Sequence, residues 1–183
     1  MLAEPVGIET ARLSLRPLSM RDLHAVHGLW TEADVRKYLW DDAVISVGEA
    51  RKYIIGSAEN FERHGFGLWG IRAKERETLV GFCGLRFLDD SSDIEILYGF
   101  SPAHRGEGFA TEAARAVIRH GFEEARLRRI LGITDLPNVA SARVLEKVGM
   151  VLLGHALYQG REELHYEITY ETFNPTDEPY SLR

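Results

Sequence analysis

The sequence predicts a mixed α/β fold (α+β), in which a mostly antiparallel sheet of seven strands carries helices on both faces. The run 13–18 alternates apolar and polar residues, which is typical of a half-buried strand. Three apolar runs at 66–73, 78–88 and 92–100 are joined by short polar turns, so they should form an antiparallel meander. A helical segment then separates 92–100 from the apolar run 128–134, and a right-handed crossover would make these two strands parallel.

The first helices should lie between the first strand and the meander. Residues 19–40 have the pattern of one or two short helices. Ser46 and Glu49 have the spacing of a capping box, in which each side chain binds the backbone of the other residue. We expect the helix that follows Ser46 to end at Gly65.

The last third of the chain should form one more helix and a closing hairpin. Asn138 caps this helix and Gly149 ends it. The runs 150–157 and 162–170 follow as the two strands of the hairpin. The tail 174–183 is polar, so we expect it to be loosely held.

The composition predicts one globular domain over residues 1–183. Apolar residues make up 45% of the chain, enough for a sizeable core. The net charge of −6 argues against non-specific nucleic-acid binding, which needs a basic surface. No apolar run reaches the roughly 18 residues of a membrane span, and the N-terminus lacks the regions of a signal peptide. We therefore expect a cytoplasmic protein that binds neither nucleic acid nor membrane.

Cys83 is the only cysteine, and it lies inside the apolar run 78–88. A single cysteine cannot form an internal disulfide, and no metal-ligand spacing surrounds it. We expect Cys83 to be a small core residue rather than a nucleophile, and we expect no metal.

Residues 104–122, HRGEGFATEAARAVIRHGF, form a glycine-rich turn that runs directly into a helix. No Ser, Thr, Asp or Asn immediately precedes this helix to cap its first N–H groups, and free N–H groups at a helix start bind anions, above all phosphates. A Walker loop does not fit, because Phe109 and Ala110 stand where Lys and Ser or Thr are needed. A dinucleotide fingerprint fits poorly, because Thr111 replaces its third glycine.

The pattern Arg/Gln-x-x-Gly-x-Gly/Ala does fit, through Arg105, Gly108 and Ala110. It resembles the pyrophosphate-binding loop of the GNAT superfamily of acyl-CoA-dependent N-acyltransferases. Four further segments resemble that superfamily in the right order: 10–23, 67–85, 94–113 and 135–154. The first two suit its ribosomal-protein N-terminal acetyltransferase (RimJ/RimL-like) branch, and the resemblance spans roughly residues 8 to 170.

The resemblance implies that acetyl-CoA is the co-substrate. Its pyrophosphate would bind backbone N–H groups of Gly106, Gly108, Phe109, Ala110 and Thr111, with the Thr111 hydroxyl as a further donor. Arg105 would neutralise phosphate charge. The pantetheine arm would add to the preceding strand like an extra strand, through backbone groups near Tyr98 and Phe100. Asn138, besides capping its helix, would contact coenzyme A.

The candidate catalytic residues are Glu95 and Ser141. Glu95 is a carboxylate inside an apolar run, so it is either a general base that frees the attacking amine or a salt-bridged structural residue. Many members of the family carry a tyrosine acid where this chain has Leu145. Ser141 is therefore the better candidate for the acid, with Tyr158 and Tyr166 as alternatives.

The expected reaction is transfer of an acetyl group from acetyl-CoA to a primary amine, by direct attack in a ternary complex. The acceptor is a protein N-terminus or a small-molecule amine, and both remain open at this point. The alternative is a non-catalytic acyl-CoA-binding or regulatory module on the same fold. A homodimer through the closing hairpin and the tail is a further expectation.

Overall fold

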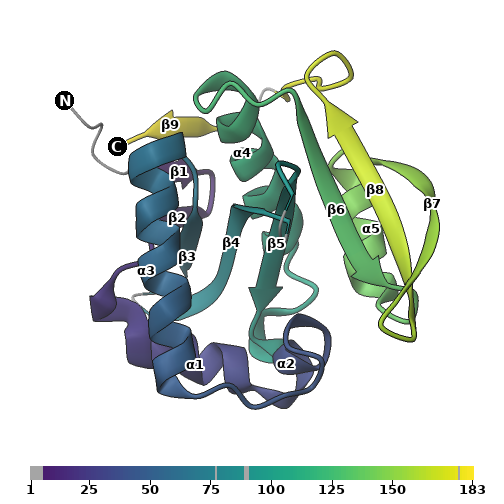
Figure 1. Ribbon diagram of the computed structural model, residues 1–183. Helices are drawn as coiled ribbons and strands as arrows, with labels where there is room; N and C mark the ends of the chain where they lie inside the picture. The colour runs from purple at the N-terminus through teal and green to yellow at the C-terminus, as the bar shows by residue number, and fades with distance from the viewer. Residues whose placement is uncertain (1–5, 77, 89–90, 177) are drawn as a thin grey trace.

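The computed structural model describes residues 6–76, 78–88, 91–176 and 178–183, and this part of the chain contains one nine-stranded sheet (Figure 1). The strand order is β7-β8-β6-β5-β4-β3-β2-β1-β9. The strands are β1 (Ile8–Thr10), β2 (Leu13–Pro17), β3 (Leu68–Ala73), β4 (Leu79–Phe87), β5 (Ile94–Phe100), β6 (Arg129–Asp135), β7 (Val151–Tyr158), β8 (Arg161–Thr169) and β9 (Tyr180–Leu182). Only β5 and β6 run parallel among the paired strands, which confirms the mixed, mostly antiparallel fold.

The helices cover both faces of the sheet, as the sequence predicts. They are α1 (Leu23–Thr31), α2 (Ala33–Leu39), α3 (Val47–His64), α4 (Phe109–Glu123) and α5 (Val139–Lys147), with short 3₁₀ turns at Met20–Asp22 and Pro102–His104. In the described part of the chain, no helix is both long and apolar enough to cross a membrane.

Two hydrophobic cores lie on opposite faces of the sheet. Val117 of α4 and Leu145 of α5 are buried in the first core, together with Cys83, whose predicted core position is confirmed. Trp30 of α1 and Ile54 of α3 are buried in the second core. Helices α4 and α5 therefore share one face, and α1 and α3 cover the other.

Two short strands, β1 and β9, raise the count from the predicted seven strands to nine. The expectation of a loosely held tail is wrong at its end, because β9 pairs antiparallel with β1. Gly7 and Arg183 extend this pairing, with the Gly7 N–H donating to the Arg183 carbonyl at 2.7 Å. Strands of three residues are too short to show a clear alternation, and these two partners stand at opposite ends of the chain.

Strand β7, the first strand of the closing hairpin, forms one edge of the sheet. It exposes large apolar side chains, namely Val151, Leu152, Leu153, Leu157 and Tyr158. The homodimer expected from this hairpin stays a prediction.

The parallel pair β5–β6 has the fewest paired residues in the middle of the sheet. Only Glu95 with Leu131 and Ile96 with Gly132 are paired. Beyond Ile96 no further pair joins the two strands in the part of the chain that the structure describes, and they diverge toward their carboxyl ends (Figure 1). The glycine-rich turn and α4 follow directly from the diverging end of β5.

Candidate functional site

The glycine-rich turn before α4 is present, and two of its glycines have a left-handed backbone conformation. Gly106 and Gly108 have φ values of +79° and +81°, in the left-handed region that side chains disfavour. Gly108 is the N-cap residue of α4, and no side chain of the described residues caps the helix there. The absence of a capping side chain, predicted from the sequence, is confirmed.

Six consecutive backbone N–H groups, from residue 106 to residue 111, have no hydrogen-bond partner within the described residues. The first N–H of this region with an acceptor is that of Glu112, which bonds the Gly108 carbonyl at 3.1 Å. Unpaired N–H groups at a helix start carry a partial positive charge. The turn is therefore a cradle for an anion.

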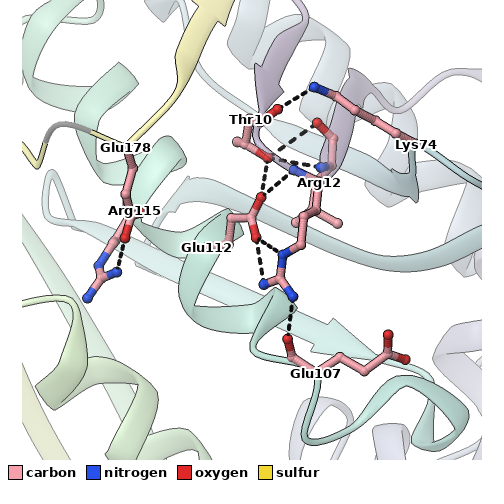
Figure 2. Close-up of polar contacts among 8 residues, drawn as sticks. Thr10, Arg12, Lys74, Glu107, Glu112, Arg115 and Glu178 are labelled. Atoms are coloured by element: carbon pink, nitrogen blue, oxygen red, sulfur yellow. Dashed lines mark hydrogen bonds and ion pairs between the residues drawn. The ribbon is translucent and has the colours of Figure 1, made fainter.

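Arg12, in the turn between β1 and β2, binds both the glycine-rich turn and the first turn of α4 (Figure 2). Its Nε donates to Glu112 Oε2 at 2.7 Å, and its NH1 donates to the Glu107 carbonyl at 2.7 Å. The guanidinium also lies over the Phe109 ring, 4.9 Å from the centroid. The sequence analysis did not assign this residue a role. The resemblance of 10–23 to the family could have raised the question, but the contact joins residues about a hundred positions apart.

Arg105 does not point freely toward the cradle. Its NH1 donates to Asp34 Oδ2 of α2 at 3.0 Å, and its NH2 donates to the Asp34 carbonyl at 3.3 Å. The residue joins the turn to the helices of the opposite face. Its expected role in neutralising phosphate stays a prediction.

The diverging end of β5 turns backbone groups toward β6. The Ser101 N–H bonds the Val80 carbonyl of the β4 side at 3.0 Å, and in an antiparallel ladder the backbone groups of alternate residues face the same neighbour. Those of Tyr98 and Phe100 therefore point away from β4, toward the side on which β6 has separated. These are the residues expected to bind an extended ligand as an added strand.

The Tyr98 side chain connects β5 to the start of α5. Its hydroxyl lies 2.9 Å from Ser141 Oγ and donates to the Ser141 carbonyl at 3.1 Å. Burial raises the pKa of the Tyr98 hydroxyl above its ordinary value of 10, so it is protonated at neutral pH. Asn138 caps α5 as predicted, since its side chain accepts from the Ser141 N–H at 3.3 Å. Tyr98, Asn138 and Ser141 thus lie together at one wall of the opening.

The Thr134 hydroxyl is a further polar group that lacks a hydrogen bond within the described residues. The residue lies on β6 beyond the last pair with β5, and its hydroxyl is buried. Side chains alternate along a strand, so Thr134 faces the same side as Gly132, where a Cβ would lie 2.7 Å from Leu145 of α5. A buried hydroxyl without a partner is costly, and a bound polar ligand would satisfy it.

Glu95 lies on the opposite face of β5 from Tyr98, because the two positions have opposite parity. Its side chain is only 7% exposed, and Arg86 Nε of β4 donates to Glu95 Oε1 at 2.6 Å. The ion pair that the sequence left open is present. It does not exclude a proton-transfer role, since a buried carboxylate needs a partner in either case.

The two alternative tyrosines differ in environment. Tyr166 is buried, and its hydroxyl donates to Glu146 Oε1 at 3.3 Å. Tyr158, at the far end of β7, is 47% exposed. Leu145 is buried in the first core, where a tyrosine acid would stand by resemblance.

A groove of about 610 Å³ runs from the turn along the outer face of α4 to the end of α5. Its lining includes the cations Arg12, Arg115, Arg119 and Lys147. Arg115 pairs with Glu178 at 2.5 Å, whereas Lys147 makes no ion pair with a described residue. The sequence analysis missed these cations, although Arg115 and Arg119 are four positions apart and must share one face of a helix.

The fold and the cradle define the class: a protein with an anion-binding turn at the carboxyl end of a diverging parallel strand pair, as in enzymes that use a phosphorylated acyl carrier. The chain matches the family model "Acetyltransferase (GNAT) domain" over residues 12–151. It therefore belongs to the GNAT acetyltransferase family, and it is an N-acetyltransferase of the acetyl-CoA-dependent kind.

Individual relatives agree with this assignment. The chain is 28% identical to the uncharacterized N-acetyltransferase YnaD of Bacillus subtilis, covering 91% of this chain and 99% of that protein. It is 25% identical to the spermidine N(1)-acetyltransferase of Escherichia coli, covering 80% and 77%. A GNAT-family acetyltransferase structure from Bacillus anthracis shares 27% identity at a TM-score of 0.76, covering 90% and 99%. RimL, a ribosomal L7/L12 protein acetyltransferase solved with coenzyme A, has the same fold, with 20% identity, a TM-score of 0.75 and coverage of 89% and 97%.

Proposed function

We propose that this chain transfers an acetyl group from acetyl-CoA directly to a primary amine within a ternary complex. The observation that carries the proposal is the row of six unpaired N–H groups beside the opening between β5 and β6. The pyrophosphate of acetyl-CoA would accept from these groups, which include those of Gly106, Gly108, Phe109, Ala110 and Thr111. The backbone groups of Tyr98 and Phe100 would hold the pantetheine arm, and Asn138 would contact it at the start of α5.

The groove along α4 would receive the phosphorylated adenosine. Lys147 is the best placed cation for the phosphate on its ribose, because it makes no ion pair within the described residues. Arg115 shares the groove but is already paired with Glu178. Binding energy from this distant part of the donor would fix the thioester for reaction.

Ser141 would act as the proton donor when the carbon–sulfur bond breaks. In the transfer, the amine nitrogen forms a bond to the acetyl carbon, and the coenzyme A sulfur leaves with the electron pair. Ser141 would give that sulfur its hydroxyl proton and would take up the second proton that the newly bonded nitrogen loses as the amide forms. Tyr98, whose hydroxyl lies 2.9 Å from Ser141 Oγ, would support the serine by a hydrogen bond. Because burial raises the Tyr98 pKa, this hydroxyl would keep its proton over the working pH range.

Glu95 would accept the proton of the attacking amine. An ammonium group cannot attack a thioester, so one proton must leave first. Glu95 lies on the face of β5 opposite Tyr98, so acid and base would act from different sides of the sheet. A water molecule would relay the proton, because the carboxylate is buried against Arg86.

The acceptor is a primary amine, and the proposal keeps two kinds: a peptide N-terminus and a small polyamine or other amine. The relatives named for spermidine and for a ribosomal protein support one each. A non-catalytic acyl-CoA-binding module would keep the cradle and show no turnover with any amine.

The direct test measures coenzyme A release from acetyl-CoA against a panel of polyamines, amino acids and N-terminal peptides. With the substrate so found, Glu95→Gln should lower kcat about 100-fold or more at neutral pH and recover at high pH, where the free amine is abundant. Arg86→Met is the matched control: it breaks the same ion pair but leaves the carboxylate. It should keep most of its activity, with a pH profile shifted upward because the carboxylate holds its proton more tightly once the neighbouring guanidinium charge is removed.

Equal losses in the two variants at every pH would show that Glu95 serves only the ion pair. Binding of acetyl-CoA without turnover of any amine would favour the non-catalytic module. Failure to bind acetyl-CoA would overturn the proposal.

A further inference from the structure

We propose that Arg12 is a positioning residue for recognition of the donor's diphosphate. It fixes one peptide group of the cradle in its binding orientation, and it neutralises the charge of a neighbouring carboxylate. The inference rests on the proposed function, because it takes the cradle to bind the diphosphate of acetyl-CoA. Arg12 contacts the turn through the Glu107 carbonyl and α4 through Glu112 (Figure 2).

The first step is the orientation of a single peptide group. Arg12 NH1 donates to the Glu107 carbonyl at 2.7 Å. The described chain contains no cis peptide bond, so the carbonyl of Glu107 and the N–H of Gly108 point in opposite directions. With the carbonyl held toward Arg12, the Gly108 N–H points away from it. This N–H is one of the six that have no partner.

The second step is the rigidity of the holding group. Glu112 Oε2 accepts from Arg12 Nε and pairs with Arg12 NH2, each at 2.7 Å. Glu112 Oε1 accepts from the Thr10 hydroxyl at 2.7 Å and from the Arg12 backbone N–H at 2.8 Å. The guanidinium therefore joins the helix and the turn through different nitrogens, which a lysine ammonium could not do with the same geometry.

The backbone of Arg12 is fixed as well. Its carbonyl accepts from the Lys74 N–H at 2.9 Å, and the Lys74 ammonium donates to the neighbouring Thr10 carbonyl. The fit against the turn is close, since a Cβ on Gly108 would lie 3.4 Å from Arg12 NH2. The β1–β2 turn is thus braced against both the sheet and α4.

The third step is electrostatic. Glu112 lies in the first turn of α4. Its negative charge interacts favourably with the helix dipole there, but it would repel a bound diphosphate. Burial raises the Glu112 pKa, but hydrogen bonds from Thr10 and Arg12 outweigh burial and leave the pKa below its ordinary value. The carboxyl is therefore ionised at neutral pH, and the paired guanidinium cancels its charge.

The test compares two acetyl donors that differ only beyond the pantetheine arm: acetyl-CoA and S-acetylpantetheine, which has no phosphate. Arg12→Ala should raise the KM for acetyl-CoA about tenfold with little change in kcat, since one oriented donor is lost and one carboxylate is uncovered. The kcat/KM for S-acetylpantetheine should stay within about twofold of wild type, because that donor never reaches the cradle. Adding Glu112→Gln to Arg12→Ala should recover part of the acetyl-CoA affinity.

A residue that only stabilises the fold would weaken both donors equally, and that result would overturn the inference. An unchanged KM for acetyl-CoA would overturn it too. If Arg12→Ala does not fold, Arg12→Lys is read by the same ratio of donors, because it keeps the charge but cannot bridge Glu107 and Glu112.

Calorimetric titration with coenzyme A and with pantetheine needs no amine acceptor, so it separates this inference from the proposed function. Wild-type protein that binds coenzyme A but acetylates no amine would contradict only the catalytic proposal. A selective loss of coenzyme A binding in Arg12→Ala would still support the role of Arg12.

Discussion

Two helices of this protein begin in opposite ways. At the start of α3, Ser46 Oγ accepts from the Glu49 N–H at 3.1 Å, and Glu49 Oε2 accepts from the Ser46 N–H at 2.7 Å. At the start of α4, Gly108 offers no side chain, and the six N–H groups of residues 106–111 stay open. The first acidic residue of α4, Glu112, does not fold back as Glu49 does but is bound by Arg12.

The difference separates a helix start that serves the fold from one that serves a ligand. A capped start satisfies its own N–H groups and needs nothing further. An uncapped start leaves about 1 kcal/mol of capping stabilisation unused, which a bound anion can supply. A ligand that binds only the folded chain then adds stability in proportion to its affinity. We expect acetyl-CoA to raise the melting temperature through the start of α4 and not through that of α3.

The largest effect is expected from giving α4 a charged cap. Gly108→Asp should weaken acetyl-CoA binding about 100-fold, because a carboxylate at the N-cap would add a negative charge at the cradle and compete with the diphosphate for the N–H groups of the helix start. Aspartate tolerates the left-handed backbone at this position, and Arg12 is already engaged with Glu107 and Glu112. Isothermal titration with coenzyme A measures the change.

Gly108→Asn is the matched control, since it has the same size and backbone preference without the charge. It should lose far less affinity than Gly108→Asp. Equal losses would mean that side-chain bulk, and not charge, excludes the ligand, and the cradle would then not be an anion site.

The next effect concerns the groove beyond the cradle. Lys147→Ala should weaken coenzyme A binding about tenfold but leave the affinity for dephospho-coenzyme A, which lacks the ribose phosphate, nearly unchanged. Arg143→Ala, on the same helix but outside the groove lining, serves as the control. If both ligands lose affinity equally in Lys147→Ala, the groove does not hold the ribose phosphate.

The sequence was enough for the start of α3 and for the backbone of the turn before α4. Ser46, Glu49 and Asn138 cap helices through contacts three residues apart, and local spacing shows such contacts. The turn at Gly106 and Gly108 was predicted from its glycines, and their positive φ angles, which glycine adopts easily, came from the structure. The seven longer strands were readable from their alternation and from the turns between them.

The contacts around these elements could not be read in the same way. Arg12 meets Glu112 across 100 positions, Tyr98 meets Ser141 across 43, and Arg105 meets Asp34 across 71. No local pattern specifies which helix start lies beside which turn. Strand β9 was not predicted for the same reason, since its partner β1 lies at the other end of the chain.

A smaller effect should follow from removing the cap of α3. Ser46→Ala should lower the free energy of unfolding by about 1 kcal/mol, because the Glu49 N–H loses its acceptor. The KM for acetyl-CoA should stay within about twofold of wild type, since this helix start lies away from the cradle. Urea denaturation and steady-state kinetics give the two numbers. A KM that rises with the loss of stability would show that the two helix starts are coupled and would break the comparison.

The smallest predicted effect is a loss of stability in acid. It applies to the first-turn carboxyls of both helices, Glu49 of α3 and Glu112 of α4. Hydrogen bonds from Ser46 lower the pKa of Glu49 below the ordinary 4.5. For Glu112, burial opposes the lowering, but the hydrogen bonds from Thr10 and Arg12 prevail. A carboxyl with a lower pKa in the folded state stabilises the fold above its unfolded pKa, and that stability is lost as the pH falls through the folded pKa.

Glu49→Gln and Glu112→Gln should therefore each be less stable than wild type at pH 7, and each difference should shrink below about pH 4.5 as the wild-type carboxyl takes up its proton. Urea unfolding followed by circular dichroism from pH 7 to about pH 3 measures the convergence. A deficit that persists undiminished in acid would mean that the glutamate stabilises its helix by packing and not by charge. If only the Glu112 deficit persists, its link to Thr10 and Arg12 is mainly a steric brace for the cradle. The charge cancellation proposed for Arg12 would then have no basis, whereas its hold on the Glu107 carbonyl would not be affected.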